Sequence, residues 1–270
     1  MDLLHGVLAI FCGGLVGFTL GLIGGGGSIM ATPLLLYVVG LSPHVAIGTG
    51  ALAVSANAFT NFGGYARQGI VRWQCAILFS IVGVVGAMIG SFLGKQVDGK
   101  QLIFLFAILM IVVGVLMLRR KARPSHTAEA RDSGKLCRLW EPASRNQWPL
   151  LGTALAVGAL SGFFGIGGGF LIVPGLLFAT GMPMICAIGS SLLAVGAFGL
   201  TTAISYGASG LVDWLVAIEY IIGGFAGGVL GMQLTKRLAG HKSALNQIFA
   251  GFVFIVAIYM LYRNAAALHL

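Results

Sequence analysis

Charged side chains are scarce in this sequence. Asp, Glu, Lys and Arg make up 9% of its 270 residues, while hydrophobic residues make up 58%. A soluble globular protein is about one quarter charged. The composition excludes an ordinary water-soluble domain, because so much apolar side-chain surface has to face lipid.

Two long stretches lack charge altogether. Residues 3–66 and residues 146–212 contain no Asp, Glu, Lys or Arg. A helical crossing of a bilayer takes about 20 residues, so each stretch has room for at least two membrane-embedded passages. We therefore expect an all-α polytopic protein that crosses the cell inner membrane several times and is surrounded by membrane lipid.

Acidic residues are scarcer than basic ones. There are 7 Asp and Glu against 16 Lys and Arg, and the formal net charge is +9. In a soluble protein this balance would suggest nucleic acid, but in a membrane protein basic residues gather in cytoplasmic loops. Eight of the basic residues fall between positions 119 and 145. We expect this segment to be a cytoplasmic linker with no nucleic-acid partner.

The two halves of the sequence repeat each other. A shift of 141 positions aligns them without a gap, and the pattern predicts tandem repeats at 1–118 and 149–270, joined by a linker at 119–148. Gly17, Gly21, Gly24, Gly26, Gly27, Pro33 and Gly40 match Gly158, Gly162, Gly165, Gly167, Gly168, Pro174 and Gly181. Each repeat is expected to begin with a glycine-interrupted segment and to continue with three helices. The interrupted segments are 4–40 and 149–181, and the helices are 44–64, 73–94, 101–118, 185–206, 213–235 and 244–262.

The distribution of basic residues favours inverted repeats. If the interrupted segment enters the membrane and returns as a re-entrant hairpin, each repeat crosses three times, and the linker side holds thirteen Lys and Arg against three. If the segment crosses completely, the repeats are parallel and the balance is eleven against five. The positive-inside rule thus favours the hairpin with both termini outside, and a kinked crossing remains the alternative.

Glycine runs interrupt both first segments at matching places. Broken helix backbone is tolerated at membrane depth only where protein or a water-filled cavity covers it, and paired breaks in two repeats indicate a midplane binding site. The freed N–H groups suit an anion. Tight helix packing is the alternative explanation for these glycines. The predicted site residues are Gly24, Gly25, Gly26, Gly27, Gly165, Gly167, Gly168 and Gly169, with Pro33 and Pro174 as helix-breaking residues.

A second glycine pattern is predicted to serve helix packing. Glycines spaced three or four residues apart share one helix face and let two backbones approach. They are Gly83, Gly86, Gly90, Gly94, Gly223, Gly224, Gly227, Gly228 and Gly231.

Small polar side chains follow the breaks. Thr49, Ser190 and Ser191 are candidate substrate ligands, because hydroxyls donate hydrogen bonds without adding charge; bonding to a carbonyl one turn earlier is the alternative. Asn57 and Asn61 are costly in lipid and are expected to face the interior as further ligands.

Few titratable residues fall within the predicted helices. Glu219 is a candidate for proton coupling, and His44 and Arg67 are candidates for gating; interfacial positions are the alternative for all three. No metal, cofactor or nucleotide motif is present, and the paired acidic, zinc or Ser/His arrangements of an intramembrane enzyme are lacking. We therefore predict neither an enzyme nor a cofactor.

Four strings carry a family resemblance: GLIGGGGSIMATPLLL and VAIGTGALAV in the first repeat, and GFFGIGGGFLIVPGLL and AIGSSLLAV in the second. The sequence resembles the sulfite exporter TauE/SafE family of bacterial membrane permeases. One departure is Gly-Thr-Gly at 48–50, where Gly-Thr-Ser is commoner in the family. The resemblance implies a secondary transporter, and an exporter, of small anions such as sulfite, organosulfonates or carboxylates. An anion channel and a non-transporting scaffold or sensor are the alternatives, and a homo-oligomer is an open possibility.

Overall fold

The computed structural model describes residues 3–119, 148–165, 169–180, 182 and 184–237. Within these ranges the chain forms nine α-helices and one 3₁₀ helix, with no strand. The helices are α1 (Leu3–Ile23), η1 (Gly24–Met30), α2 (Ala31–Tyr37), α3 (Pro43–Arg67), α4 (Trp73–Gln96), α5 (Gly99–Arg119), α6 (Trp148–Phe164), α7 (Gly169–Thr180), α8 (Met184–Gly207) and α9 (Trp214–Arg237). The predicted helix at 244–262 lies outside the described residues, as does the linker except for its two end residues.

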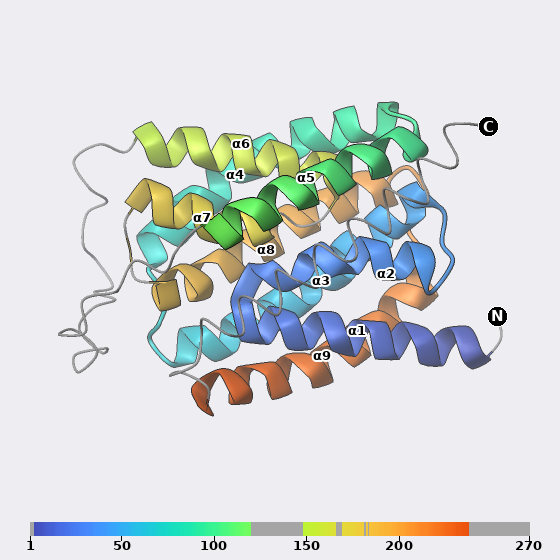
Figure 1. The fold of residues 1–270 in the computed structure, drawn as a ribbon, viewed down its shortest axis with the longest axis horizontal. Helices are drawn as coiled ribbons and strands as arrows, with labels where there is room; N and C mark the ends of the chain where they lie inside the picture. Colours follow the sequence, from blue (N-terminus) through green and yellow to red (C-terminus); the bar gives the residue numbers. More distant parts are fainter. Residues whose placement is uncertain (1–2, 120–147, 166–168, 181, 183, 238–270) are drawn as a thin grey trace.

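The first interrupted segment folds as a hairpin. Gly24 has a φ of +74°, a left-handed conformation that ends α1 and that side chains with a Cβ rarely adopt. Both η1 and α2 contact α1, and Figure 1 shows the chain reversing after α1 so that α2 runs back alongside it. The interruption predicted by the glycines is therefore a reversal of chain direction.

The second interrupted segment begins in the same way. Gly165 has a φ of +64° and follows α6 directly. α7 begins at Gly169 and contacts both α6 and η1. The two interrupted segments thus contact each other through η1 and α7.

The first helix of each half, α1 or α6, packs against a helix of the opposite half. α1 packs on α9, and α6 packs on α4. A Cβ at Gly17 would collide with the backbone of Gly224, and a Cβ at Gly158 would collide with that of Gly83. The predicted packing role of the second glycine pattern is confirmed, because every one of its members lies against a backbone or side chain of a neighbouring helix.

The contacts recur when positions are shifted by 141. Several contacts between a residue of the first half and one of the second are matched by a contact between their counterparts, with the two halves exchanged. The contacts of Gly17 with Gly224, Gly21 with Gly228, Gly24 with Ile188 and Gly48 with Leu211 match those of Gly158 with Gly83, Gly162 with Ala87, Gly165 with Ile47 and Gly189 with Ile70.

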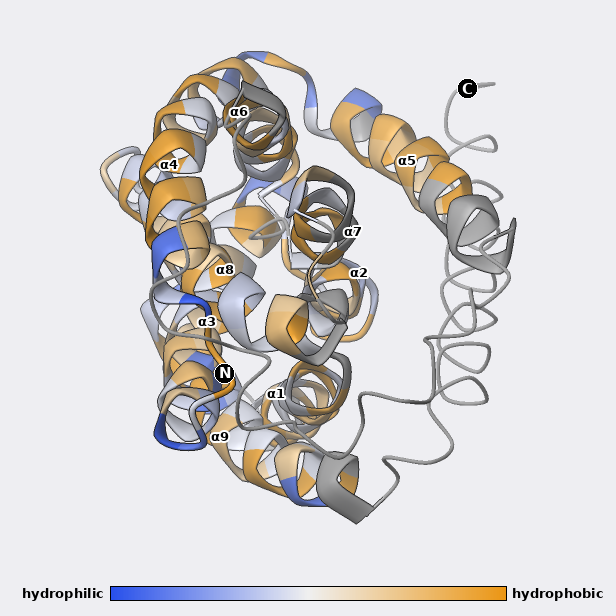
Figure 2. Cartoon of the chain, turned by 90° about the vertical axis from the view of Figure 1, so that its left-hand side faces the viewer, coloured by the Kyte–Doolittle hydropathy of each residue, from blue (hydrophilic) through white to orange (hydrophobic). Residues whose placement is uncertain are grey.

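Helices α3 and α8 form the centre of the bundle. They cross antiparallel, because Gly199 lies against Ala51 while Gly196 lies against Phe59. Long apolar side chains on the outer helices stay exposed, including Ile81 of α4 and Ile222 of α9, and Figure 2 colours much of α4 and of the described part of α5 as hydrophobic. By length and composition, Trp73–Gln96, Cys186–Gly207 and Trp214–Leu234 are candidate membrane spans within the described residues.

Candidate functional site

The two glycine breaks pack against matching isoleucines of the opposite half. A Cβ at Gly24 would lie 2.7 Å from Cγ2 of Ile188, and a Cβ at Gly165 would collide with Cγ2 of Ile47. Each isoleucine belongs to the Ala-Ile-Gly string that opens α8 or α3. Both breaks therefore need glycine for two reasons, a positive φ and a close neighbour.

The remaining residues of the breaks divide between described and undescribed segments. Gly25, Gly26 and Gly27 are part of η1, and Gly27 packs against Thr19 and Leu20 of α1. Gly169 opens α7. Gly167 and Gly168 lie outside the described residues.

The two prolines do not break the helices. Pro33 is the third residue of α2 and Pro174 is the sixth residue of α7. The first turn of a helix has no intrahelical partners for its N–H groups, so Pro33 removes no hydrogen bond there. The predicted role of the prolines is thus corrected, since the glycines with positive φ make the reversals.

Two of the predicted hydroxyl ligands hold loops of the opposite half. The Asp213 N–H, at the start of α9, donates to Oγ1 of Thr49 at 2.9 Å. The Arg72 N–H, at the start of α4, donates to Oγ of Ser190 at 3.0 Å. Because α3 and α8 are antiparallel, Thr49 and Ser190 lie toward opposite ends of the bundle.

Ser191 makes the local bond that was the alternative to ligand binding. Its Oγ donates to the carbonyl of Ile188 at 2.8 Å, within α8. Its hydroxyl hydrogen is therefore engaged in this state of the protein.

Asn57 and Asn61 lie in the interior, as predicted. Their side chains are 1% and 2% exposed. Both amide atoms of Asn57 and the Nδ2 of Asn61 have no hydrogen-bond partner. Both asparagines pack on α9, Asn57 against Gly224 and Asn61 against Gly228.

The three titratable candidates have different surroundings. Glu219 is partly buried. A Cβ added at Gly6 of α1 would lie 2.8 Å from its Oε1. Arg67 is the exposed last residue of α3. His44 is the second residue of α3 and stacks on the ring of Tyr206 at 6.4 Å. No described contact brings these three side chains together.

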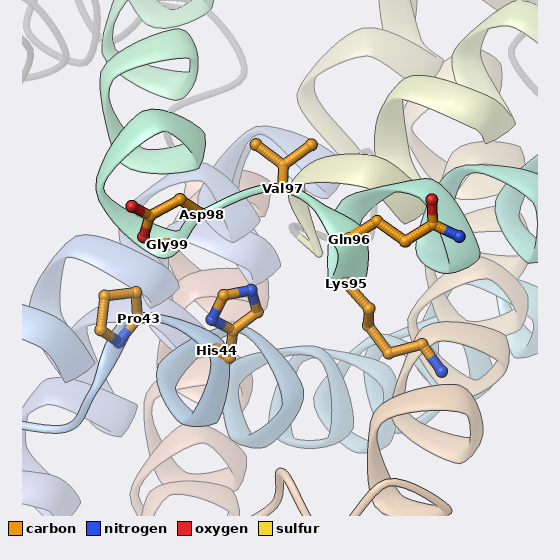
Figure 3. Close-up of a pocket in the computed structure, with 7 residues that line it drawn as sticks. All are labelled: Pro43, His44, Lys95, Gln96, Val97, Asp98 and Gly99. Atoms are coloured by element: carbon orange, nitrogen blue, oxygen red, sulfur yellow. The ribbon is translucent and has the colours of Figure 1, made fainter.

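A pocket of about 610 Å³ opens beside His44. Figure 3 shows His44 between Asp98 and Lys95, at the turn that joins α4 to α5. Nζ of Lys95 donates to the Ser205 carbonyl at 3.1 Å and contacts Oγ of Ser209. The pocket therefore lies at one end of the bundle and not at the glycine breaks.

The sequence did not single out Tyr206 or Tyr220 as polar residues of the interior. Both side chains are 0% exposed, and both hydroxyls are unpartnered. A comparison of the repeats would have identified Tyr220 as an extra polar group, because its counterpart, Phe79, lacks the hydroxyl.

Comparisons with known proteins match this chain to membrane transporters. The family described as sulfite exporter TauE/SafE matches residues 9–260. A probable membrane transporter protein of Xylella fastidiosa (strain 9a5c) is 51% identical over 263 residues, which cover 97% of each chain. The probable membrane transporter protein YunE of Bacillus subtilis (strain 168) is 31% identical over 243 residues, or 83% of this chain and 87% of the relative. No solved structure matches.

Proposed function

Since this chain belongs to the sulfite exporter TauE/SafE family and is an integral membrane transporter rather than an enzyme, we propose that it exports small anions by alternating access. The substrates are sulfite, organosulfonates or related carboxylates. Because no nucleotide-binding motif occurs in the sequence, transport runs down a gradient or is coupled to protons.

The observation that carries this proposal is the matching placement of the two breaks. Each lies against the opposite half, and η1 contacts α7. In secondary transporters, interrupted helices at the interface of two repeats surround the substrate near the bilayer midplane. Backbone N–H groups of η1 and of the start of α7 supply partial positive charge to an anion there.

The two repeats have inverted topology in this proposal. The hairpin of α1, η1 and α2 returns to the side where it began, which leaves three crossings for the first repeat. The exchange of contacts under the 141-residue shift supports a two-fold relation between the repeats. Rocking of one repeat against the other would then open the site alternately to the two sides.

The charged residues support a cytoplasmic position for the linker. Arg67 and Arg72 flank the turn between α3 and α4, and Gln68 of that turn contacts Met232 near the end of α9. Lys236 and Arg237 close α9 at the same end. Asp98, Asp213 and Glu219 belong to the opposite end, where α3 and α9 begin. Basic residues favour the cytoplasmic side.

The substrate in this proposal contacts Asn57 and Asn61 and the glycines of the breaks along its path, since the two breaks lie toward opposite ends of α3 and α8. Thr49, Ser190 and Ser191 take part only when their present hydrogen bonds open. Glu219 is the group available for proton coupling, and His44 and Arg67 are the groups available for gating near the two ends of α3. No cofactor is required.

Flux into liposomes tests this function. Purified protein should accelerate the movement of sulfite or sulfoacetate across the bilayer, with a rate that saturates at high concentration, whereas empty liposomes should not. Unitary currents in a planar bilayer would favour a channel. Absence of flux for these anions and for small carboxylates would contradict the proposed substrate class.

A further inference from the structure

Three buried polar side chains line the crossing of α1, α3 and α9. Asn57 packs on Gly224 and Asn61 packs on Gly228. Tyr220 precedes Gly224 by one turn, so Tyr220, Gly224 and Gly228 share one face of α9. We call Asn57, Asn61 and Tyr220 the polar cluster.

The polar cluster has unmet hydrogen-bonding capacity. The Nδ2 and Oδ1 of Asn57, the Nδ2 of Asn61 and the hydroxyl of Tyr220 are buried without a partner. A buried polar group left unpaired costs about 1–3 kcal/mol. Several such groups on one face indicate a partner that satisfies them, because native proteins rarely leave buried polar atoms unpaired.

The matching place in the second half is apolar. The counterparts of Tyr220 and Asn57 are Phe79 and Phe198, whose rings stack with their centroids 6.2 Å apart. Asn61 corresponds to Thr202. The same helix crossing is therefore built once with aromatic rings and once with polar groups, so packing does not account for the polar cluster.

The polar cluster offers three donors and one acceptor, all of them uncharged. The donors are the amide nitrogens of Asn57 and Asn61 and the hydroxyl of Tyr220; the acceptor is Oδ1 of Asn57. An anion with several oxygens is able to accept from more than one donor. An anion that also carries an acidic proton satisfies the acceptor.

We propose that the polar cluster binds a small protonated oxyanion, such as hydrogen sulfite, as the substrate-selecting half of the transport site. This inference rests on the proposed function and adds that the site is one-sided, with its ligands where α3 crosses α9. Neutral donors bind the anion without the strong attraction of a buried cation, so that the anion is able to leave.

The nearest acidic group on the packed helices stands apart from the polar cluster. Glu219 faces Gly6 of α1, whereas a Cβ at Gly13 would meet the backbone of Tyr220. Seven residues of α-helix separate these positions, or about 10 Å along α1. Arg67 is exposed at the end of α3.

Calorimetric titration of the purified full-length protein with sodium hydrogen sulfite tests this inference. Tyr220→Phe removes one hydroxyl and recreates the residue found at position 79, so its fold should persist. Asn57→Leu removes the amide. Each should weaken binding by about tenfold, the effect of losing one hydrogen bond to a charged ligand. Thr202→Val is the matched control, because it removes the unpartnered hydroxyl at the counterpart of Asn61 and should leave affinity within about twofold.

Three outcomes would overturn the inference. Wild-type affinity in both variants, with a raised unfolding temperature, would make the polar cluster a structural feature only. Stabilisation by sodium chloride, lost in the variants and equal to that by sodium hydrogen sulfite, would show that the polar cluster does not select a protonated oxyanion. If the wild-type protein neither binds nor transports an anion, the proposed function is contradicted as well. If the variants bind and transport normally, only this inference is contradicted.

Discussion

The Ser55 hydroxyl donates a hydrogen bond of 2.7 Å to the carbonyl of Gly196, and the two residues are 141 positions apart. They are therefore the same position in the two halves of the chain. In a two-fold arrangement, a contact between equivalent positions lies on the axis. The crossing of α3 and α8 at Ser55 therefore brings equivalent positions of the two halves into contact.

Ser55→Ala should lower the free energy of unfolding by about 0.5–1.5 kcal/mol, because a buried hydrogen bond between the halves is lost. Thr60→Ala is the matched control, since Oγ1 of Thr60 bonds only to the Ala56 carbonyl of its own helix and is exposed; its effect should stay below about 0.5 kcal/mol. Chemical unfolding in detergent measures both. Equal losses would contradict an interface role for Ser55.

Thr49→Val and Ser190→Ala should destabilise the protein by similar amounts, about 1 kcal/mol each, because each leaves a backbone N–H at a helix start without its acceptor. The two sites lie toward opposite ends of the bundle, so the double variant should lose the sum within about 0.5 kcal/mol. Thr49→Ser should remain near wild type. Thermal unfolding would contradict the equivalence of the two sites if only one variant were destabilised.

Gly158→Ala should be strongly destabilising, by about 2 kcal/mol or more, because the added methyl group meets the backbone of Gly83 and the helices have to separate. Gly152→Ala in the same helix meets no atom within 4 Å and should be neutral or stabilising by up to about 1 kcal/mol. Unfolding of the two variants side by side gives the comparison. A harmless Gly158→Ala would mean that α4 and α6 are not in contact.

Gln68→Cys and Ser209→Cys should react with a membrane-impermeant maleimide from opposite sides of the membrane. Both residues are exposed and occupy the same position in the two repeats, so inverted topology puts them on opposite faces. A background without the four native cysteines keeps the labelling specific. Labelling of both from one side of intact cells would establish parallel repeats.

The sequence predicted those features of the fold that depend on local chemistry. The glycine breaks at Gly24 and Gly165 and the glycine faces of α4 and α9 follow from residue type and spacing alone. The prediction for Pro33 was wrong, because Pro33 lies in the first turn of α2, where a proline removes no helical hydrogen bond. Pro174 lies inside α7, and only the structure shows where α2 and α7 begin.

The hydrogen-bond partners of the candidate site residues depend on the fold, and the sequence did not predict them. Thr49 and Ser190 bond to loops more than 100 residues away in sequence, and no spacing rule links such positions. The importance of Tyr220 arises from its place opposite α3, which the helical pattern alone does not give. The predicted site roles of these residues stay predictions until binding is measured.

Sulfite flux through Gly24→Ala and Gly40→Ala in proteoliposomes tests most directly whether the breaks form the transport site. Both glycines have positive φ, 74° and 82°, so both alanines introduce similar backbone strain. Only at Gly24 does the new methyl group approach a neighbour, Ile188, because Gly40 has no atom within 4 Å. We predict that Gly24→Ala lowers saturable flux at least about tenfold, equivalent to 1.4 kcal/mol, while Gly40→Ala keeps wild-type flux. Equal flux in the two folded variants would contradict a transport site at the breaks.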